Sequence, residues 1–135
     1  MIGLDTNILL RWLMADALTE KEDLGQAVLV GDFMSAEEDK LFVNHIVLVE
    51  TIWVLKRRVK LSRSSLVAVM KTILDSAIVI ADPHIVTAAM DMYSRYPGDF
   101  SDHLIAAVNQ QNGCRTTMTF DKAASKSPNF SELQR

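Results

Sequence analysis

The sequence predicts an α/β protein whose central parallel sheet is covered by helices on both faces. Short apolar segments that fit strands recur along the chain, at residues 2–5, 41–43, 77–81 and 115–120. Longer segments with helical periodicity separate them. Neither a linker nor an internal repeat interrupts this alternation, so we expect one domain over residues 1–135.

Composition narrows the class of protein. With 49% hydrophobic and 23% charged residues, the 135-residue chain is typical of a globular protein and not of a disordered one. No apolar run has the length of a membrane span, and Met1 leads almost directly into the first strand, which leaves no room for a signal peptide. The single Cys114 cannot form an internal disulfide, and we expect it to be a buried, inert thiol. These features favour a cytoplasmic protein.

The net charge of −3 argues against a protein that coats nucleic acid in general. It does not argue against a nuclease, because an acidic metal site is itself negative and bound metal ions offset that charge.

The first strand, 2–5, leads into a helix that Asp5 or Thr6 can cap and that extends to about Ala15. Thr19 and Glu22 form a capping box for a second helix, which extends to about Ser35. The apolar residues expected on its inner face are Leu24, Ala27, Val28, Phe33 and Met34.

After the strand at 41–43, the length and the Lys/Arg ending of residues 45–58 favour a helix. Glu50 is the only charged residue between Ile46 and Leu55 in this segment. Ser62 caps a fourth helix that extends to about Ser76, and the strand at 77–81 follows it.

The last third of the chain contains two more helices. Asp82 and Pro83 are typical of a helix start, and this helix extends to about Arg95. The next helix begins near Ser101 or Asp102 and ends at Asn112. The strand at 115–120, a short helix at 121–125 and a weakly apolar tail complete the chain.

Four carboxylates lie directly beside core-forming residues, where an unpaired charge costs free energy. They are Asp5 after the first strand, Glu50 in an apolar helix, Asp102 at a helix start and Asp121 after the fourth strand. We expect the four to converge and share divalent cations. A set of carboxylates without His or Cys suits Mg²⁺ or Mn²⁺, and a pair of such ions suits phosphodiester cleavage.

Each acid also has a simpler interpretation. Asp5, Asp102 and Asp121 are each in a position to cap a helix, and Glu50 can face solvent on an amphipathic helix. Asp99 lies in the loop before Asp102 and is expected to support the site without binding metal directly. The four acids taken together are more specific than any one of them.

Taken in order, these segments resemble the PIN-domain family, and in particular the VapC-type toxin ribonucleases of type II toxin–antitoxin pairs. The resemblance covers nearly the whole chain. The residues that carry it are Leu4-Asp5-Thr6-Asn7 followed by Ile8-Leu9-Leu10-Arg11, Val49-Glu50 followed by Trp53-Val54-Leu55, Asp99-Phe100-Ser101-Asp102 followed by Leu104-Ile105-Ala106-Ala107, and Thr119-Phe120-Asp121.

The resemblance implies a three-layer α/β/α sandwich and a metal-dependent endoribonuclease. It places metal-binding, catalytic acids at Asp5, Glu50, Asp102 and Asp121, with Mg²⁺ or Mn²⁺ as cofactor. It further implies supporting roles for Thr6, for Asn7 as an orienting amide and for Thr119 as a hydroxyl beside the site. Its members are commonly homodimers that a cognate antitoxin inhibits.

Two features depart from the family pattern. His103 follows Asp102 where the family usually has a small residue, and we expect it to be a surface or supporting histidine. The short tail after Asp121 leaves open whether a fifth strand forms.

Basic residues give a weaker signal for contact with RNA or an antitoxin. Lys56, Arg57 and Arg58 lie with Lys60 and Arg63 in one short stretch, where they can contact RNA backbone or simply favour a helix C-terminus. Arg11 can contact phosphate or neutralise an acid, and we favour the second.

Two other functions remain as alternatives. A catalytically silent PIN-fold module that binds RNA or a protein partner would share the fold, although the presence of all four acids argues against it. A Mg²⁺-dependent phosphatase or receiver protein would also carry an acid after its first strand. The segment Asp5-Thr6-Asn7 lacks the second Asp expected there.

Overall fold

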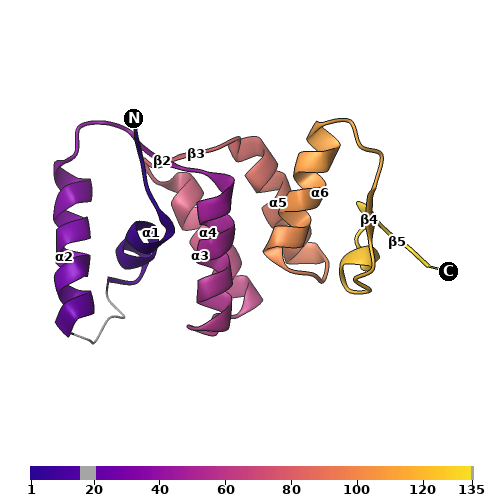
Figure 1. Cartoon of the computed structure of the whole chain (residues 1–135), viewed down its shortest axis with the longest axis horizontal. Coiled ribbons are helices and arrows are strands. Elements are labelled where there is room, and N and C mark those ends of the chain that lie inside the picture. Colours follow the sequence, from indigo (N-terminus) through magenta and orange to yellow (C-terminus); the bar gives the residue numbers. More distant parts are fainter. Residues whose placement is uncertain (16–20, 135) are drawn as a thin grey trace. The chain divides into compact units, whose positions relative to one another are not determined.

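The computed structural model describes residues 1–15 and 21–134, without the side chains of residues 21–23. The capping box predicted at Thr19 therefore lies outside the described residues. The chain forms two compact units, each described by itself here. The first unit contains Met1–Val59 and Leu74–Ala81, and the second contains Lys60–Ile73 and Asp82–Arg135. Figure 1 shows the order of the elements along the chain.

A three-stranded parallel sheet forms in the first unit. Its strands are β1 (Ile2–Gly3), β2 (Leu41–Val43) and β3 (Val79–Ile80), in the order β1-β2-β3. Ile2 pairs with Leu41, and Phe42 pairs with Val79. Parallel strands need long crossover connections, which is why helices separate them in sequence. The predicted α/β class with parallel strands is confirmed.

The helices of the first unit are α1 (Thr6–Leu13), α2 (Lys21–Ala36) and α3 (His45–Arg57). Helices α1 and α2 lie side by side (Figure 1). The predicted inner face of α2 is only partly right, because Ala27 and Val30 are its buried residues. Leu24, Val28 and Phe33 are exposed instead. Apolar residues surround most of this helix, so periodicity alone does not choose which face packs.

The helices of the second unit include most of α4 (Arg63–Asp75), with α5 (Pro83–Arg95) and α6 (Phe100–Gln111). Helices α5 and α6 pack against each other (Figure 1). Their contact buries Val86, Ala89, Tyr93 and Leu104, which recur at helical spacing on the two inner faces.

A second parallel sheet joins β4 (Thr117–Thr119) to β5 (Phe130–Glu132), with the 3-10 helix η2 (Ala124–Lys126) between them. The fifth strand therefore forms, although the tail is short. The amide of Leu133 donates to the Thr119 carbonyl over 2.8 Å. Phe130 is buried with Ala106 and Ala124, which anchors the strand.

No helix among the described residues combines the length and the apolar character needed to cross a membrane.

Candidate functional site

Asp5 occupies the junction between β1 and α1. Its backbone is extended (φ −91°, ψ 175°), and its Oδ1 accepts a hydrogen bond from the Ile8 amide at 3.0 Å. Asp5 is therefore the N-cap of α1. Its side chain is exposed, and capping uses only one of its two oxygens. Helix capping and metal binding are thus compatible at Asp5.

Glu50 lies on α3 and contacts the start of α1. Its Oε2 accepts a hydrogen bond from the Thr6 hydroxyl at 3.3 Å. The side chain is exposed, whereas the neighbouring Thr51 is fully buried. Glu50 thus faces solvent, which is the simpler of its two interpretations, because α3 turns residues such as Leu48 and Ile52 inward. Its role as a metal ligand stays a prediction.

Asp102 and Asp99 lie at the start of α6 in the second unit. Asp99 is the N-cap, and its amide donates to Oδ2 of Asp102 at 3.0 Å. This bond is the half of a capping box in which the third helical residue reaches back to the cap. Both carboxylates are half-buried.

Asp121 closes the turn after β4. Its Oδ1 accepts from the amides of Ala123 at 2.8 Å and Ala124 at 3.2 Å. The Thr119 hydroxyl in turn accepts from the Asp121 amide at 3.0 Å. Thr119 thus orients the backbone that carries Asp121, and the Asp121 carboxylate is exposed. The predicted role of Thr119 beside the site stays a prediction.

Gly98 lies against both acidic segments of the second unit. A Cβ at this glycine would lie 3.6 Å from Oδ2 of Asp102 and 3.5 Å from Cα of Ala124. Ala124 belongs to the turn that Asp121 holds. The second unit therefore brings the Asp102 carboxylate close to the Asp121 turn, and the first unit brings the start of α1 to Glu50.

One pattern is common to the four predicted metal-binding acids. In each, a protein donor binds one carboxylate oxygen, and the second oxygen accepts no hydrogen bond from the described part of the chain. Oxygen donors of this kind fit Mg²⁺ or Mn²⁺. Within residues 1–15 and 21–134, no cluster of three or more His, Cys, Asp or Glu side chains has the spacing to hold a metal ion. Each unit carries two of the four acids.

A depression of about 400 Å³ lies beside Asp5. Asn7 and Arg11 line it together with Ile8, Gln26, Leu29 and Val30. Arg11 donates from Nε to Oε1 of Gln26 at 2.8 Å, so its guanidinium is oriented by α2 along this wall. The predicted roles of Asn7 and Arg11 stay predictions, and both residues border the same depression as the first acid.

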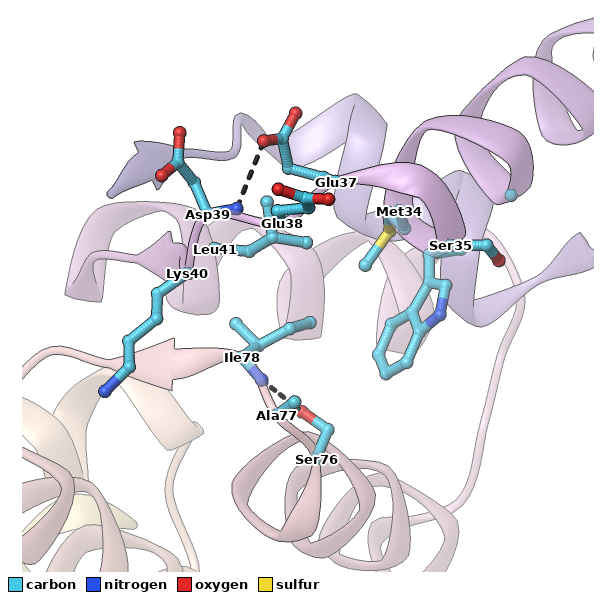
Figure 2. Close-up of a pocket in the computed structure, with 12 residues that line it drawn as sticks. Met34, Ser35, Glu37, Glu38, Asp39, Lys40, Leu41, Ser76, Ala77 and Ile78 are labelled. Carbon is cyan, nitrogen blue, oxygen red and sulfur yellow. Dashed lines mark hydrogen bonds between the residues drawn. The ribbon is translucent and has the colours of Figure 1, made fainter.

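A second hollow of about 500 Å³ has none of the four predicted metal-binding acids in its lining (Figure 2). Residues that precede β2 and β3 line it, and within it the Asp39 amide donates to the Glu37 carboxylate at 3.2 Å. These residues mark the amino ends of the strands, whereas Asp5 follows the carboxyl end of β1. Ligands of parallel α/β sheets bind at the carboxyl ends, which favours the Asp5 side.

The basic residues Lys56, Arg57 and Arg58 lie at the C-terminus of α3. Positive charge is favourable there because the last helical carbonyls point toward it. Arg57 and Arg58 are exposed and Lys56 is half-buried. Their contact with RNA or an antitoxin stays a prediction.

His103 is buried, with 1% of its surface exposed. Of the two expected roles, the surface histidine is therefore wrong, and the supporting histidine stays a prediction. Its Nε2 lies 3.0 Å from the Pro97 carbonyl. Burial lowers the pKa of His103 below 6.5, and the bond to Pro97 offsets part of that effect. The neutral ring therefore belongs to the packing beneath Asp102. The prediction that Cys114 is a buried thiol is also wrong, because Cys114 is exposed.

The bonds of Arg63 are the feature of the second unit that sequence patterns do not identify. Arg63 lies in the basic stretch, yet its guanidinium binds the backbone carbonyls of Tyr93, Tyr96 and Gly98, at the end of α5 and in the loop before Asp99. No local signal marks it, because those carbonyls lie 30 or more residues further along the chain.

Comparison with known proteins assigns the chain to a family. A family model described as PIN domain matches residues 2–128. None of the curated proteins matches the chain. Since the matched region spans nearly the whole sequence and includes all four acids, the chain belongs to the PIN-domain family.

Proposed function

We propose that this protein is a metal-dependent endoribonuclease and that it acts as the toxin of a type II toxin–antitoxin pair. The PIN domain is a nuclease-type fold, and members are generally metal-dependent nucleases. The observation that carries the proposal is a hydrogen-bonding pattern common to the four acids. Each has one oxygen fixed by a protein donor and a second oxygen that accepts no hydrogen bond within the described residues.

Asp5, Glu50, Asp102 and Asp121 are the proposed metal ligands. When bound, Mg²⁺ or Mn²⁺ would supply a water nucleophile at neutral pH and would stabilise the leaving oxygen. The protein itself orients the ligands before any metal binds. The Ile8 amide holds Asp5, the Thr6 hydroxyl holds Glu50, and the remaining two are held by the backbone amides described above. Such orientation avoids reorganising the carboxylates during the reaction.

RNA is the proposed substrate. The depression beside Asp5 has Arg11 in its wall, and this cation can attract a phosphate toward Asp5. Lys56, Arg57 and Arg58 are proposed to contact the RNA backbone or the antitoxin. We further propose a cytoplasmic homodimer that a cognate antitoxin inhibits.

A catalytically silent module that binds RNA or protein is the second candidate. A module without metal chemistry has no need for four carboxylates that each leave an oxygen available. Calorimetric titration with Mn²⁺ separates the two functions, since the module should bind no divalent ion.

The decisive experiment replaces Asp5 with Asn. Asn is as good an N-cap as Asp, so the variant keeps the bond to Ile8 while it loses the charge. We expect Asp5→Asn to abolish Mg²⁺-dependent RNA cleavage and growth inhibition with the fold intact. Asp32→Asn, at an exposed position on α2, is the matched control and should stay active. Equal cleavage by wild type and Asp5→Asn, or cleavage that persists in EDTA, would contradict the proposal.

A further inference from the structure

The guanidinium of Arg63 binds the end of α5 and the loop that follows it. Nε donates to the Tyr93 carbonyl at 2.8 Å, and one terminal nitrogen donates to the carbonyls of Tyr96 and Gly98, both at 2.7 Å. The guanidinium carbon lies 3.9 Å from the centre of the Tyr93 ring. A planar guanidinium has several N–H donors in a fixed arrangement and stacks on aromatic rings. A lysine ammonium cannot reproduce both features.

His103 holds the same loop from α6. Its Nε2 contacts the Pro97 carbonyl, which can only accept, so Nε2 carries the proton. The buried ring packs edge-on against Tyr93 and Phe130, with centroids 6.1 Å and 6.5 Å away. The carbonyls of Tyr96, Pro97 and Gly98 are therefore all bound by side chains from other elements. Three consecutive peptide groups thus have their orientation fixed.

One hydrogen bond, from the Asp99 amide to Asp102, links the orientation of this loop to the Asp102 carboxylate. The peptide that joins Gly98 to Asp99 presents its oxygen to Arg63 and its N–H to Oδ2 of Asp102. Gly98 has φ +108°, and it lies directly against that carboxylate oxygen. Rotation of this single peptide would change both bonds together. Arg63 and Asp102 thus bind opposite ends of the same peptide group.

We propose that Arg63 is a positioning residue that orients the Asp102 carboxylate through the Gly98–Asp99 peptide. Arg63 lies in a basic stretch where contact with RNA is the simpler expectation, but its guanidinium donates to three carbonyls of the protein itself. The inference rests on the proposed function only in treating Asp102 as a metal ligand. The bonds that carry it lie within the second unit.

Two variants test the role, Arg63→Lys and Arg63→Gln, with Lys71→Gln on the exposed side of α4 as matched control. One measurement is the Mg²⁺ concentration that gives half-maximal RNA cleavage by the full chain, together with the rate at saturating Mg²⁺ and the KM for RNA. The other is hydrogen exchange at the Asp99 amide in metal-free protein, which needs no activity.

We expect the half-saturating Mg²⁺ concentration to rise about tenfold in Arg63→Lys, which is typical when a residue that orients a metal ligand is lost. High Mg²⁺ should restore most of the rate, and the Asp99 amide should exchange faster. Lys71→Gln should match wild type in all measurements. If Arg63→Gln does not fold, Arg63→Lys, which keeps the charge, carries the test.

An unchanged Mg²⁺ requirement and unchanged Asp99 exchange in a folded variant would overturn the role. A higher KM for RNA with an unchanged Mg²⁺ requirement would overturn it as well and would assign Arg63 to RNA contact. If wild type cleaves no RNA with any divalent ion, the proposed function fails. The positioning role is then decided by Asp99 exchange and by calorimetric Mn²⁺ binding, which should both weaken in Arg63→Lys.

Discussion

Thr6 donates its hydroxyl hydrogen to Oε2 of Glu50 over 3.3 Å, and this bond joins the first turn of α1 to α3. Thr6 directly follows Asp5, so the residue next to one proposed metal ligand holds the side chain of another. A neutral hydroxyl orients the carboxylate without cancelling its charge. Thr6 is thereby suited to preserve metal binding while it fixes the geometry of Glu50.

Thr6→Val should lower RNA cleavage about tenfold, as expected when a partner that orients a metal ligand is lost. Valine keeps the branched shape and removes only the donor. Because the bond is exposed, the free energy of unfolding should fall by less than about 1 kcal/mol. Initial cleavage rates and urea unfolding check the two effects separately.

The matched control is Thr72→Val on α4, which removes a hydroxyl that donates to the Ala68 carbonyl of its own helix. This variant should cleave RNA at the wild-type rate. If the two valine variants lose activity equally, the bond between Thr6 and Glu50 has no specific role.

Asp5 combines two functions that different substitutions separate. Asp5→Ala removes both the charge and the N-cap bond to Ile8, and should lower the free energy of unfolding by about 1 kcal/mol. Asp5→Asn removes the charge alone, and its free energy of unfolding should be close to that of wild type. Both should be inactive. Equal stability of the two variants in urea would show that the bond to Ile8 contributes little.

The positions of the acids along the chain could be predicted because their signals are local. Asp5 and Asp121 follow strands, and Asp102 lies three residues after the N-cap Asp99. What a local pattern cannot give is the side-chain environment. Burial of His103 depends on Tyr93 and Phe130, and the bonds of Arg63 depend on a loop more than 30 residues away. Such contacts follow from tertiary packing.

The fold class could be predicted for the same reason, since strands and helices alternate with clear periodicity. The packed face of α2 could not, because Val28 and Val30 are equally apolar and only tertiary contact distinguishes them. The strand β5 was uncertain because its residues are weakly apolar. Pairing with β4 and burial of Phe130 decide that it forms.

Gly98→Ala should destabilise the protein. Its φ of +108° is strained for any residue with a Cβ, and the new atom would lie 3.4 Å from Nε2 of His103. We expect a loss of about 1–3 kcal/mol in the free energy of unfolding. Cleavage should fall as well, because the new atom would also lie 3.6 Å from Oδ2 of Asp102. Thermal and urea unfolding measure the loss.

Gly25→Ala is the matched control, and it should raise the free energy of unfolding where Gly98→Ala lowers it. Gly25 lies within α2 with open space where its Cβ would be. Alanine is favoured over glycine inside a helix by about 1 kcal/mol, so this variant should be more stable than wild type. If both alanine variants shift stability in the same direction, the strain assigned to Gly98 is not the cause.

Thr51 offers a different test, because its fully buried hydroxyl has no hydrogen-bond partner among the described residues. A buried polar group without a partner costs about 1–3 kcal/mol, and valine replaces the hydroxyl with a methyl group of similar size. Thr51→Val should therefore be neutral or more stable in urea, with wild-type cleavage. Thr51→Ser keeps the hydroxyl and removes the methyl group, and should lose about 1 kcal/mol through the small cavity. The opposite order of stability would mean that the hydroxyl of Thr51 is satisfied in solution.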